Sequence, residues 1–541
     1  MQPTGLAGRV LSADDATASA LLNCLVREVC APEHRVWTDG PHLVIRLPRA
    51  GVELRSRLTR PPVGFTYRLA APYEERRDGR WIAVSWRRLA DLIAGELELA
   101  TGEANPEFLG QVAASHAALE ALVDARSTGH GPPGFVESEQ SLVAGHRFHP
   151  SPKARQGAPA EWLPYAPEAG ARFPLRWLGV RGDLVAEGGE PSEFAALEAL
   201  GPPSPRGYRL LPAHPWQLSL LADRPVLRRA LARGDVLDLG AAGPEVVPTS
   251  SVRTVYVPDA DLFCKFSLDV RITNCVRKNS WYELAGAVTL DRLLRPVFAG
   301  MEGCRLLSEP AYRSVHLADV RLYEGLGVIL REGVGSVPGT PLLAAALADP
   351  YAATPPCPET PENALIWWER YVGLVVPPVL DAFLVHGVVL EPHLQNVLVS
   401  VDEEGMPLQA VFRDLEGTKL VAGRWDRHLA GLPERVREAL TYDADHGWNR
   451  VVYCLFVNHL AEVAAAVADL HPRLERDLWR TVRERVASLA HDHPGNARLR
   501  ALLDGASLPA KANLRARWAR SADRAATYVP VPNPLRGHMS P

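Results

Sequence analysis

Cysteine is scarce in this sequence, and its copies show no pairing pattern. Seven cysteines are scattered over 541 residues, an odd number with no Cys-x-x-Cys pair. A disulfide framework needs an even, closely spaced set, and a thiolate zinc site usually contains such a pair. The composition therefore argues against both kinds of site and favours a cytoplasmic protein.

The sequence also lacks a charge excess of either sign. It contains 59 Lys and Arg against 63 Asp and Glu, a formal net charge of -4. Surfaces that bind nucleic acids or anionic membranes need a strong basic excess. We therefore expect neither partner, and any positive charge that serves the function must be local.

No stretch predicts export or membrane insertion. The first 15 residues have no basic segment followed by an apolar run, so they do not read as a secretory signal. The longest apolar stretch, 371–390, contains a double proline and two ionisable side chains, Asp381 and His386. Such residues are rare in a membrane span. We interpret this stretch as a buried helix.

The length predicts several subdomains, because one compact core rarely spans 541 residues. Residues 10–125 are expected to be mainly helical, with strand-like interruptions at 42–46 and 52–60 and a helix at 89–99. A Gly/Pro-rich break follows at 128–134. Further boundaries and elements are a proline-rich region with short strands at 140–330, a loose stretch at 348–362, and a largely helical part to about 520.

A helix, a polar loop and a hairpin are predicted in succession near residue 390. The helix covers 363–386 and ends at Gly387, a normal terminator. The hairpin has strands at 397–401 and 408–413 around a turn at 402–405. A symmetric closure on that turn places Asp414 across from His393.

The polar loop 391–396 (Glu-Pro-His-Leu-Gln-Asn) and Asp414 together suit a metal site. Two carboxylates, Glu391 and Asp414, with the amide oxygens of Gln395 and Asn396, are ligands for a hard cation such as Mg²⁺ held against nucleotide phosphates. The alternative is a polar loop whose side chains only satisfy turn hydrogen bonds. Convergence of five polar groups on one hairpin favours the functional interpretation.

Three further segments carry anion-binding side chains. Segment 248–254 (Pro-Thr-Ser-Ser-Val-Arg-Thr) offers hydroxyls and a guanidinium to phosphate oxygens, or is a Ser/Thr-rich turn. Lys265 alternates with apolar residues, which predicts the polar face of a strand; the alternative is a solvated edge. Segment 145–155 holds two His, one Lys and two Arg, which suit a triphosphate or an exposed basic loop. On physical grounds 214–217 (His-Pro-Trp-Gln) is expected to be packing.

In chain order these motifs resemble the NRPS-independent siderophore (NIS) synthetases, the IucA/IucC-type enzymes. Each motif alone is weak, but the ordered set, which spans about residues 130–515, is highly specific. The motifs are 145–155, 214–217, 248–254, Lys265 to Arg277, 391–396, Arg413-Asp414 and Pro509-Ala-Lys511. One position departs from the family pattern, because Arg147 stands where the family commonly has Pro.

The resemblance implies an α+β fold shaped like a hand, which we divide into a helical thumb (1–130), mixed fingers (131–345) and a kinase-like palm (346–541). It implies an ATP-dependent ligase of siderophore biosynthesis that adenylates citrate or a related di- or tricarboxylate. An amine, hydroxylamine-type amine or alcohol then attacks, with release of AMP and pyrophosphate. It also suggests a homodimer. The alternatives are a kinase-like phosphotransferase and a non-catalytic binding protein that keeps the fold.

The resemblance also implies residue roles, which agree with the need to offset anion repulsion when a carboxylate attacks a phosphate. Phosphate binding would fall to Ser251, Arg253, Thr254 and Lys265, with help from His146, His149 and Lys153. Arg277 would bridge the α-phosphate and the carboxylate substrate, which Thr273, His393 and Lys511 would face. Mg²⁺ would be bound by Glu391 and Asp414, near Gln395 and Asn396.

Overall fold

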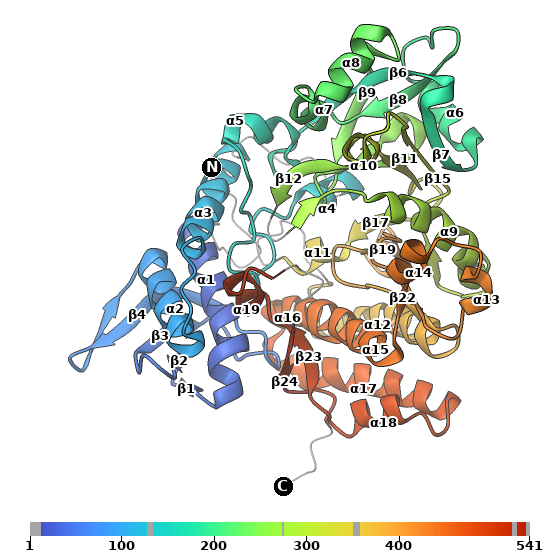
Figure 1. Cartoon of the computed structure of the whole chain (residues 1–541). Coiled ribbons are helices and arrows are strands. Elements are labelled where there is room, and N and C mark those ends of the chain that lie inside the picture. The colour runs from blue at the N-terminus through green and yellow to red at the C-terminus, as the bar shows by residue number, and fades with distance from the viewer. Residues whose placement is uncertain (1–11, 127–133, 273–274, 350–356, 522–526, 537–541) are drawn as a thin grey trace.

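The computed structural model describes residues 12–126, 134–272, 275–349, 357–521 and 527–536, and it mixes helices and strands along the whole chain (Figure 1). The predicted α+β class is therefore confirmed. The predicted break at 128–134 lies almost entirely outside the described residues.

The N-terminal part combines helices with a five-stranded antiparallel sheet in the order β1-β2-β3-β4-β5. The predicted strands at 42–46 and 52–60 are present as β2 and β3, whereas the helical expectation is wrong for β1, β4 and β5. The reason is that each of these three strands pairs antiparallel with its chain neighbour, and alternate side chains of the sheet such as Leu43 and Ile45 pack on the helices. The elements are α1 (Ala13–Leu25), η1 (Val26–Cys30), η2 (Ala31–Glu33), β1 (Val36–Asp39), β2 (His42–Arg46), β3 (Glu53–Leu58), β4 (Leu69–Arg77), β5 (Arg80–Ala83), α2 (Trp86–Thr101) and α3 (Phe108–Ala125).

The middle of the chain is built on an eight-stranded sheet in the order β7-β15-β16-β11-β10-β9-β6-β8. Strand β11 is central, and all five of its residues are buried. Lys265 is therefore not at a solvated edge, so that alternative is wrong; its side chain meets Asp414 and Glu416, so the predicted polar surroundings are present but buried. The strands are β6 (Phe173–Arg181), β7 (Val185–Gly189), β8 (Tyr208–Ala213), β9 (Val236–Pro248), β10 (Thr254–Val257), β11 (Leu262–Phe266), β15 (Ala311–Val315) and β16 (Val328–Glu332).

Short helices and one two-stranded ribbon surround this sheet, and the long helix α9 packs against it. At the start of the short helix α7, His214 is buried among aromatic rings and caps the helix, which confirms the packing interpretation of 214–217. The elements are α4 (Phe135–Gln140), α5 (Pro159–Trp162), α6 (Ala195–Glu198), α7 (Pro215–Leu221), α8 (Pro225–Arg233), β12 (Leu268–Ile272), β13 (Cys275–Arg277), α9 (Trp281–Ala299), α10 (Val320–Gly325) and α11 (Ala344–Leu347).

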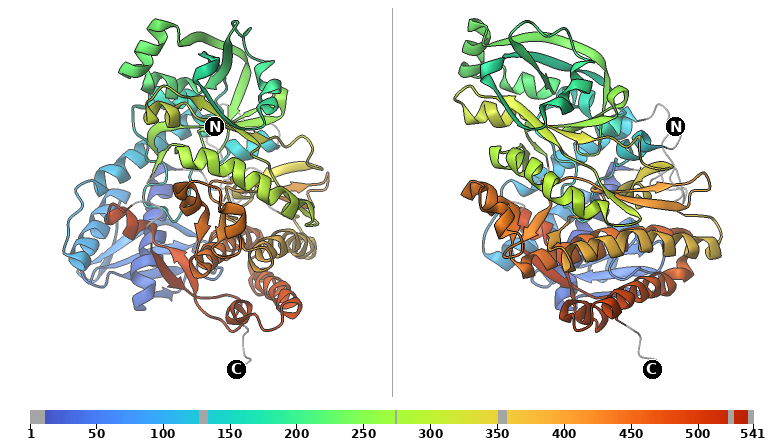
Figure 2. Two further views of the ribbon diagram at one scale, coloured as in Figure 1. Left: turned by 45° about the vertical axis from the view of Figure 1, so that its right-hand side comes forward. Right: turned by 90° about the vertical axis from the view of Figure 1, so that its right-hand side faces the viewer.

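The C-terminal part is largely helical, as predicted, and α12 lies beside α17 at the end of the molecule opposite the eight-stranded sheet (Figure 2). Thr360 caps α12, and Gly387, with φ of +65°, lies just beyond its end. The helices are α12 (Pro361–Leu384), α13 (Asp426–Leu429), α14 (Glu434–Leu440), α15 (Ala444–Val452), η8 (Tyr453–Leu460), α16 (Ala461–Leu470), α17 (Glu475–Asp492), α18 (Ala497–Leu503) and α19 (Asn513–Trp518). Small sheets are formed by β14 (Cys304–Leu306), β17 (Thr340–Leu343), β18 (Val388–Val389), β19 (Val397–Val401), β20 (Pro407–Phe412), β21 (Lys419–Val421), β22 (Thr441–Tyr442), β23 (Leu508–Lys511) and β24 (Tyr528–Val531).

The predicted hairpin is present, but its register differs by two residues from the prediction. Val397 pairs with Phe412, so Arg413 lies across from Asn396, and Asp414 follows opposite Gln395 rather than His393. A longer turn and an irregularity between Ser400 and Val401 account for the shift. Because the shift is even, each side chain keeps its face.

One helical run, Ala444–Leu470, is long and apolar enough by length and composition to cross a membrane. Its most apolar window is entirely buried inside the protein, where it forms the core beneath α12 and the small sheets. It is therefore a core helix by its packing. The apolar stretch 371–390 is likewise buried, and it forms the end of the helix α12 followed by the short strand β18.

Candidate active site

A cavity of about 1130 Å³ opens between the three parts of the chain. Its lining brings together most of the predicted site residues: His146, His149, Lys153, Ser251, Arg253, Thr254, Glu391, His393, Gln395, Asn396, Asp414 and Lys511. Lys265 lies directly behind the lining. Thr273 lies outside the described residues, as does the side chain of Arg277, so neither position is tested.

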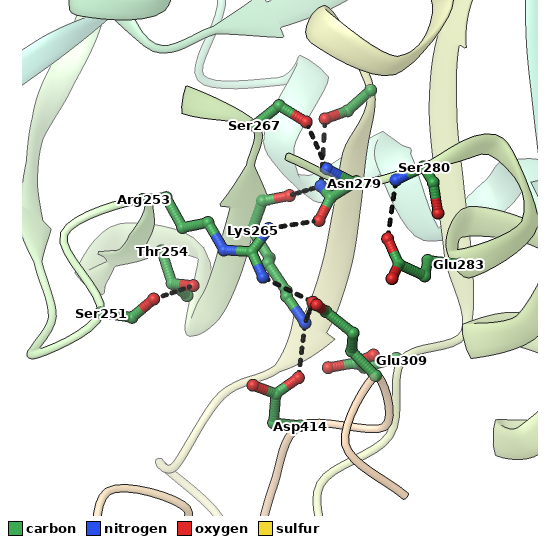
Figure 3. Close-up of polar contacts among 12 residues, drawn as sticks. Ser251, Arg253, Thr254, Lys265, Ser267, Asn279, Ser280, Glu283, Glu309 and Asp414 are labelled. Carbon is green, nitrogen blue, oxygen red and sulfur yellow. Dashed lines mark hydrogen bonds and ion pairs between the residues drawn. The ribbon is translucent and has the colours of Figure 1, made fainter. Parts of the chain in front are cut away.

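Two buried cations and two carboxylates form the centre of the site (Figure 3). The ammonium of Lys265 donates to Asp414 Oδ1 at 2.5 Å and lies 2.8 Å from Glu416 Oε2. Arg253 Nη2 donates to the same Glu416 Oε2 at 2.5 Å. Each cation thus contacts a carboxylate on the loop that follows β20, which joins the middle and C-terminal parts of the chain.

The backbone register explains why these cations lie together. Thr254 and Lys265 are direct partners in the β10–β11 ladder, so Arg253 enters the site beside Lys265. Asn279 braces both, because its Oδ1 accepts from Arg253 Nη1 at 2.7 Å and its Nδ2 donates to the Lys265 carbonyl at 3.2 Å (Figure 3). Ser251 contacts the Thr254 hydroxyl at 3.4 Å. Contacts within the protein thus hold the proposed phosphate-binding side chains in place before any ligand binds.

Electrostatics keep both carboxylates ionised. Burial disfavours the charge of Asp414, but Lys265 and Arg331 outweigh it and hold the pKa of that carboxyl well below its usual range. Burial acts in the same way on Glu416, and Arg253 and Lys265 lower its pKa to about 2. Both groups carry negative charge at neutral pH.

Two residues of the site have strained backbones. Val252 has φ of +64° and Asp414 has φ of +78°. A β-branched residue rarely adopts a positive φ, and such strain persists only where the surroundings enforce it. The surrounding structure therefore fixes the turn before β10 and the end of the hairpin. These two segments carry Arg253 and Asp414.

The loop 391–396 is fixed from several sides. Gln395 Nε2 donates to the Ser250 carbonyl at 2.8 Å, which ties the loop to the phosphate-binding turn. From the π-helix η8, Asn458 Oδ1 accepts from Leu394 N at 3.2 Å, and His459 Nδ1 lies 2.9 Å from the Pro392 carbonyl oxygen. π-Helical turns are frequent at functional sites.

Two of the cavity histidines, His146 and His393, are neutral at pH 7. Solvent reaches His146 through the cavity, yet dense surroundings and the charge of Arg27 lower its pKa to about 4. Burial also lowers the pKa of His393. Asn458 Nδ2 lies 2.8 Å from His146 Nε2. Both imidazoles can therefore act as neutral hydrogen-bonding groups toward an anionic substrate.

Two predicted residues have strong protein partners in this structure. Lys153 Nζ donates to Glu168 and to the Leu142 carbonyl, both at 2.5 Å. Glu391 pairs with Arg450. Each lines the cavity, but its charge is neutralised by one partner, Glu168 for Lys153 and Arg450 for Glu391. The ammonium of Lys265, in contrast, is shared between two carboxylates.

The oxygen donors fit Mg²⁺. Mg²⁺ is usually held by one or two carboxylates together with substrate phosphates and water, rather than by a full protein cage. Within the described ranges, no group of three or more His, Cys, Asp or Glu forms such a cage. Asp414 and Glu416, which share the Lys265 ammonium, supply the required pair.

Sequence reasoning missed several residues of the site. Glu416 follows Asp414 by two positions, and the Asp-x-Glu spacing after a predicted strand was its available signal. Asn279, Arg331 and Asn458 carried no local signal, because their roles arise only from contacts between distant segments.

Comparisons with known proteins agree with this site. Residues 134–349 match the family model described as IucA / IucC family, and 96% of the chain aligns at 29% identity with 97% of the rhizobactin siderophore biosynthesis protein RhbC of Rhizobium meliloti. The chain is therefore similar to the IucA/IucC family. Residues 365–526 match a second model, described as ferric iron reductase FhuF-like transporter.

Other relatives of this chain are named as ligases or synthetases. The L-2,3-diaminopropanoate–citrate ligase of Staphylococcus aureus is 29% identical, over 74% of each chain. The ATP-bound aerobactin synthetase IucA of Klebsiella pneumoniae superposes with a TM-score of 0.82 at 25% identity, covering 97% of this chain and 100% of that one. The petrobactin biosynthesis protein AsbB of Bacillus anthracis shares the fold, with a TM-score of 0.76 at 18% identity over 96% of this chain and 95% of that one.

Proposed function

We propose that this protein is an ATP-dependent ligase of siderophore biosynthesis. It joins citrate, or a related di- or tricarboxylate, to an amine, hydroxylamine-type amine or alcohol, and it releases AMP and pyrophosphate. The observation that carries the proposal is the shared centre of Arg253, Lys265, Asp414 and Glu416 in one cavity with His393. Its similarity to a relative named as a citrate ligase supports the substrate class.

The charges of this centre suit acyl-adenylate formation. A carboxylate that attacks the α-phosphate of ATP must approach another anion, so fixed cations are needed at the point of attack. Arg253 and Lys265 supply them, with Ser251 and Thr254 as neutral donors. Arg277, Thr273 and Lys511 are proposed to face the carboxylate substrate beside His393. Bound Mg²⁺ would offset phosphate charge, with Asp414, Glu416 and the nearby Asn396 as its proposed protein donors and Glu391 as a further candidate.

We also propose a hand-like architecture with divisions at 130 and 345. Further proposals are a cytoplasmic location, a homodimer, and phosphate contacts by His146, His149, Lys153 and Gln395. The architecture rests on the resemblance and on the five-stranded, eight-stranded and helical parts that surround the cavity.

The nucleotide product tests the proposal. The protein is incubated with ATP, Mg²⁺, citrate and hydroxylamine, which traps an activated acyl group as a hydroxamate. We expect AMP, pyrophosphate and the hydroxamate in equal amounts, measured by chromatography and a coupled pyrophosphate assay. Formation of ADP and phosphate would instead support the kinase-like alternative, which the comparisons do not favour.

A further inference from the structure

A second group of charged side chains lines the cavity on the side of the N-terminal helices. This group, here called the arginine cluster, consists of Arg27, Arg68, Arg147 and Glu462. None of them takes part in the chemistry proposed above. Together with Asp349, which also lines the cavity, the cluster sets three guanidinium groups against two carboxylates.

Arg27 is a buried cation with unused hydrogen-bonding capacity. Its side chain extends from η1 and stacks on the ring of Phe148, with Cζ 3.1 Å from the ring centroid. The residue is only 5% exposed, and among the residues that the structure describes its Nε and Nη2 have no hydrogen-bond partner. Unpaired buried donors are costly, which points to a ligand that completes them.

The helix that leads to Arg27 leaves room for such a ligand. Ala16, Ser19 and Ala20 line the cavity from α1, at helical spacing on the face that continues toward Arg27. Their side chains are all small. The space beside the guanidinium is therefore cavity rather than protein core.

Glu462 offers the opposite charge close by. Its Oε2 lies 3.4 Å from Arg68 Nη1 and 3.3 Å from Arg147 Nε, while its Oε1 has no hydrogen-bond partner among the described residues. Arg68 is in addition held by Asp469 at 2.7 Å. Arg27 and Glu462 thus line one cavity, and each carries buried polar atoms that have no hydrogen-bond partner among the described residues.

We propose that the arginine cluster is the acceptor subsite and that the acceptor is zwitterionic, an amine that also carries a carboxylate. This inference rests on the proposed function. The carboxylate would take the free donors of Arg27, and the adjacent ammonium would donate to Glu462 Oε1. A polyamine without a carboxylate would place its positive charges among three guanidinium groups, which is unfavourable.

The neighbourhood of the cluster puts the acceptor next to the activated acid. His146 lies within the electrostatic influence of Arg27, Glu462, His393 and Lys511, so the cluster adjoins the proposed acid subsite. With its head group held, the acceptor's second, neutral amine attacks the acyl carbon. As the C–N bond forms, the amine loses a proton to water, and the bond from the acyl carbon to the phosphate oxygen breaks with its electron pair on that oxygen, which releases AMP.

A panel of matched acceptors tests the inference with the unmodified protein. Each pair contains a diamino acid and its decarboxylated counterpart: 2,3-diaminopropanoate with 1,2-diaminoethane, ornithine with 1,4-diaminobutane, and lysine with 1,5-diaminopentane. Pyrophosphate release with ATP and citrate gives kcat/KM, and mass spectrometry identifies the product. We expect the carboxylated member of the preferred pair to be at least about tenfold better. An equal or reversed preference overturns the inference.

The variant Arg27→Gln locates the effect. We expect it to raise the KM for the amino acid at least about tenfold, to reduce the preference within the pair toward one, and to leave the KM for citrate within about twofold. Arg35→Gln, at an exposed arginine just beyond η2, is the matched control. A raised KM for citrate with an unchanged pair preference would assign Arg27 to the acid instead and overturn the inference. Absence of both AMP and hydroxamate in the hydroxylamine assay would contradict the proposed function itself, a separate outcome.

Discussion

At the scale of single residues, the ammonium of Lys265 holds two carboxylates in place, and its removal has separable effects on stability and catalysis. We expect Lys265→Met to lower the free energy of unfolding by about 3–5 kcal/mol, because Asp414 and Glu416 lose a shared buried partner. We expect turnover to fall at least about 100-fold, because a cation that faces the developing charge is lost. Urea denaturation and pyrophosphate release measure the two effects.

The double variant Lys265→Met/Glu416→Gln separates the two roles. It removes one of the negative charges left behind, so part of the stability should return. Turnover should stay low, because the phosphates still lack their cation and Glu416, a proposed Mg²⁺ donor, is also lost. Recovery of turnover in the double variant would show that Lys265 acts only through the fold.

At the scale of elements, η8 positions the loop 391–396 without being adjacent to it in sequence. We expect Asn458→Ala to reduce kcat/KM about 10- to 100-fold, since it removes the acceptor for Leu394 N and the contact with His146. The free energy of unfolding should fall by only about 1 kcal/mol. Asn449→Ala, at an exposed position in the preceding helix, serves as the control, and an equal loss in both variants would contradict the positioning role.

Local patterns predicted most elements of the site, but not their depth or exact pairing. The helix ending near Gly387 and the hairpin after it follow from glycine placement and alternation, and both are present. The register was wrong because an irregularity between Ser400 and Val401 has no strong sequence signal. The polar face predicted for Lys265 left its burial open, because alternation cannot distinguish a half-buried strand from a central one whose lysine is neutralised by Asp414.

At the scale of the whole molecule, the cavity exists only because three distant regions meet. Arg27 comes from the first helices, Arg253 from the middle sheet, and His393 and Lys511 from the C-terminal part. The chain ends are linked directly, since Glu28 accepts from Leu514 N and Arg515 N at 2.9 Å. Such contacts leave no local pattern, so the arginine cluster could not be found from the sequence, whereas the ordered motifs of the middle and C-terminal parts could.

The same burial makes the stability of the whole molecule depend on pH. Burial lowers the pKa of His214 to about 3 and that of His459 to about 4, while both titrate near 6.5 when unfolded. The unfolded chain therefore binds more protons between pH 6.5 and 4, and the stability present above pH 6.5 is lost as the pH falls. Glu28 acts in the opposite sense, because burial raises its pKa to about 7, and its contribution is lost as the pH rises toward 7.

His214 and His459, together with His146 and His393 of the cavity, outweigh Glu28, so we expect the free energy of unfolding to decrease from pH 6.5 to 5. Each histidine contributes up to about 1.4 kcal/mol per pH unit in this range. His214→Asn keeps a cap for α7 but removes one titrating group, so it should flatten the slope by up to that amount in urea titrations at each pH. His428→Asn, at an exposed histidine, should leave the slope unchanged. A slope that is the same in all three proteins would mean that His214 has the same pKa in the fold as in the unfolded chain, which its enclosure by Tyr165, Phe173 and Phe266 makes unfavourable.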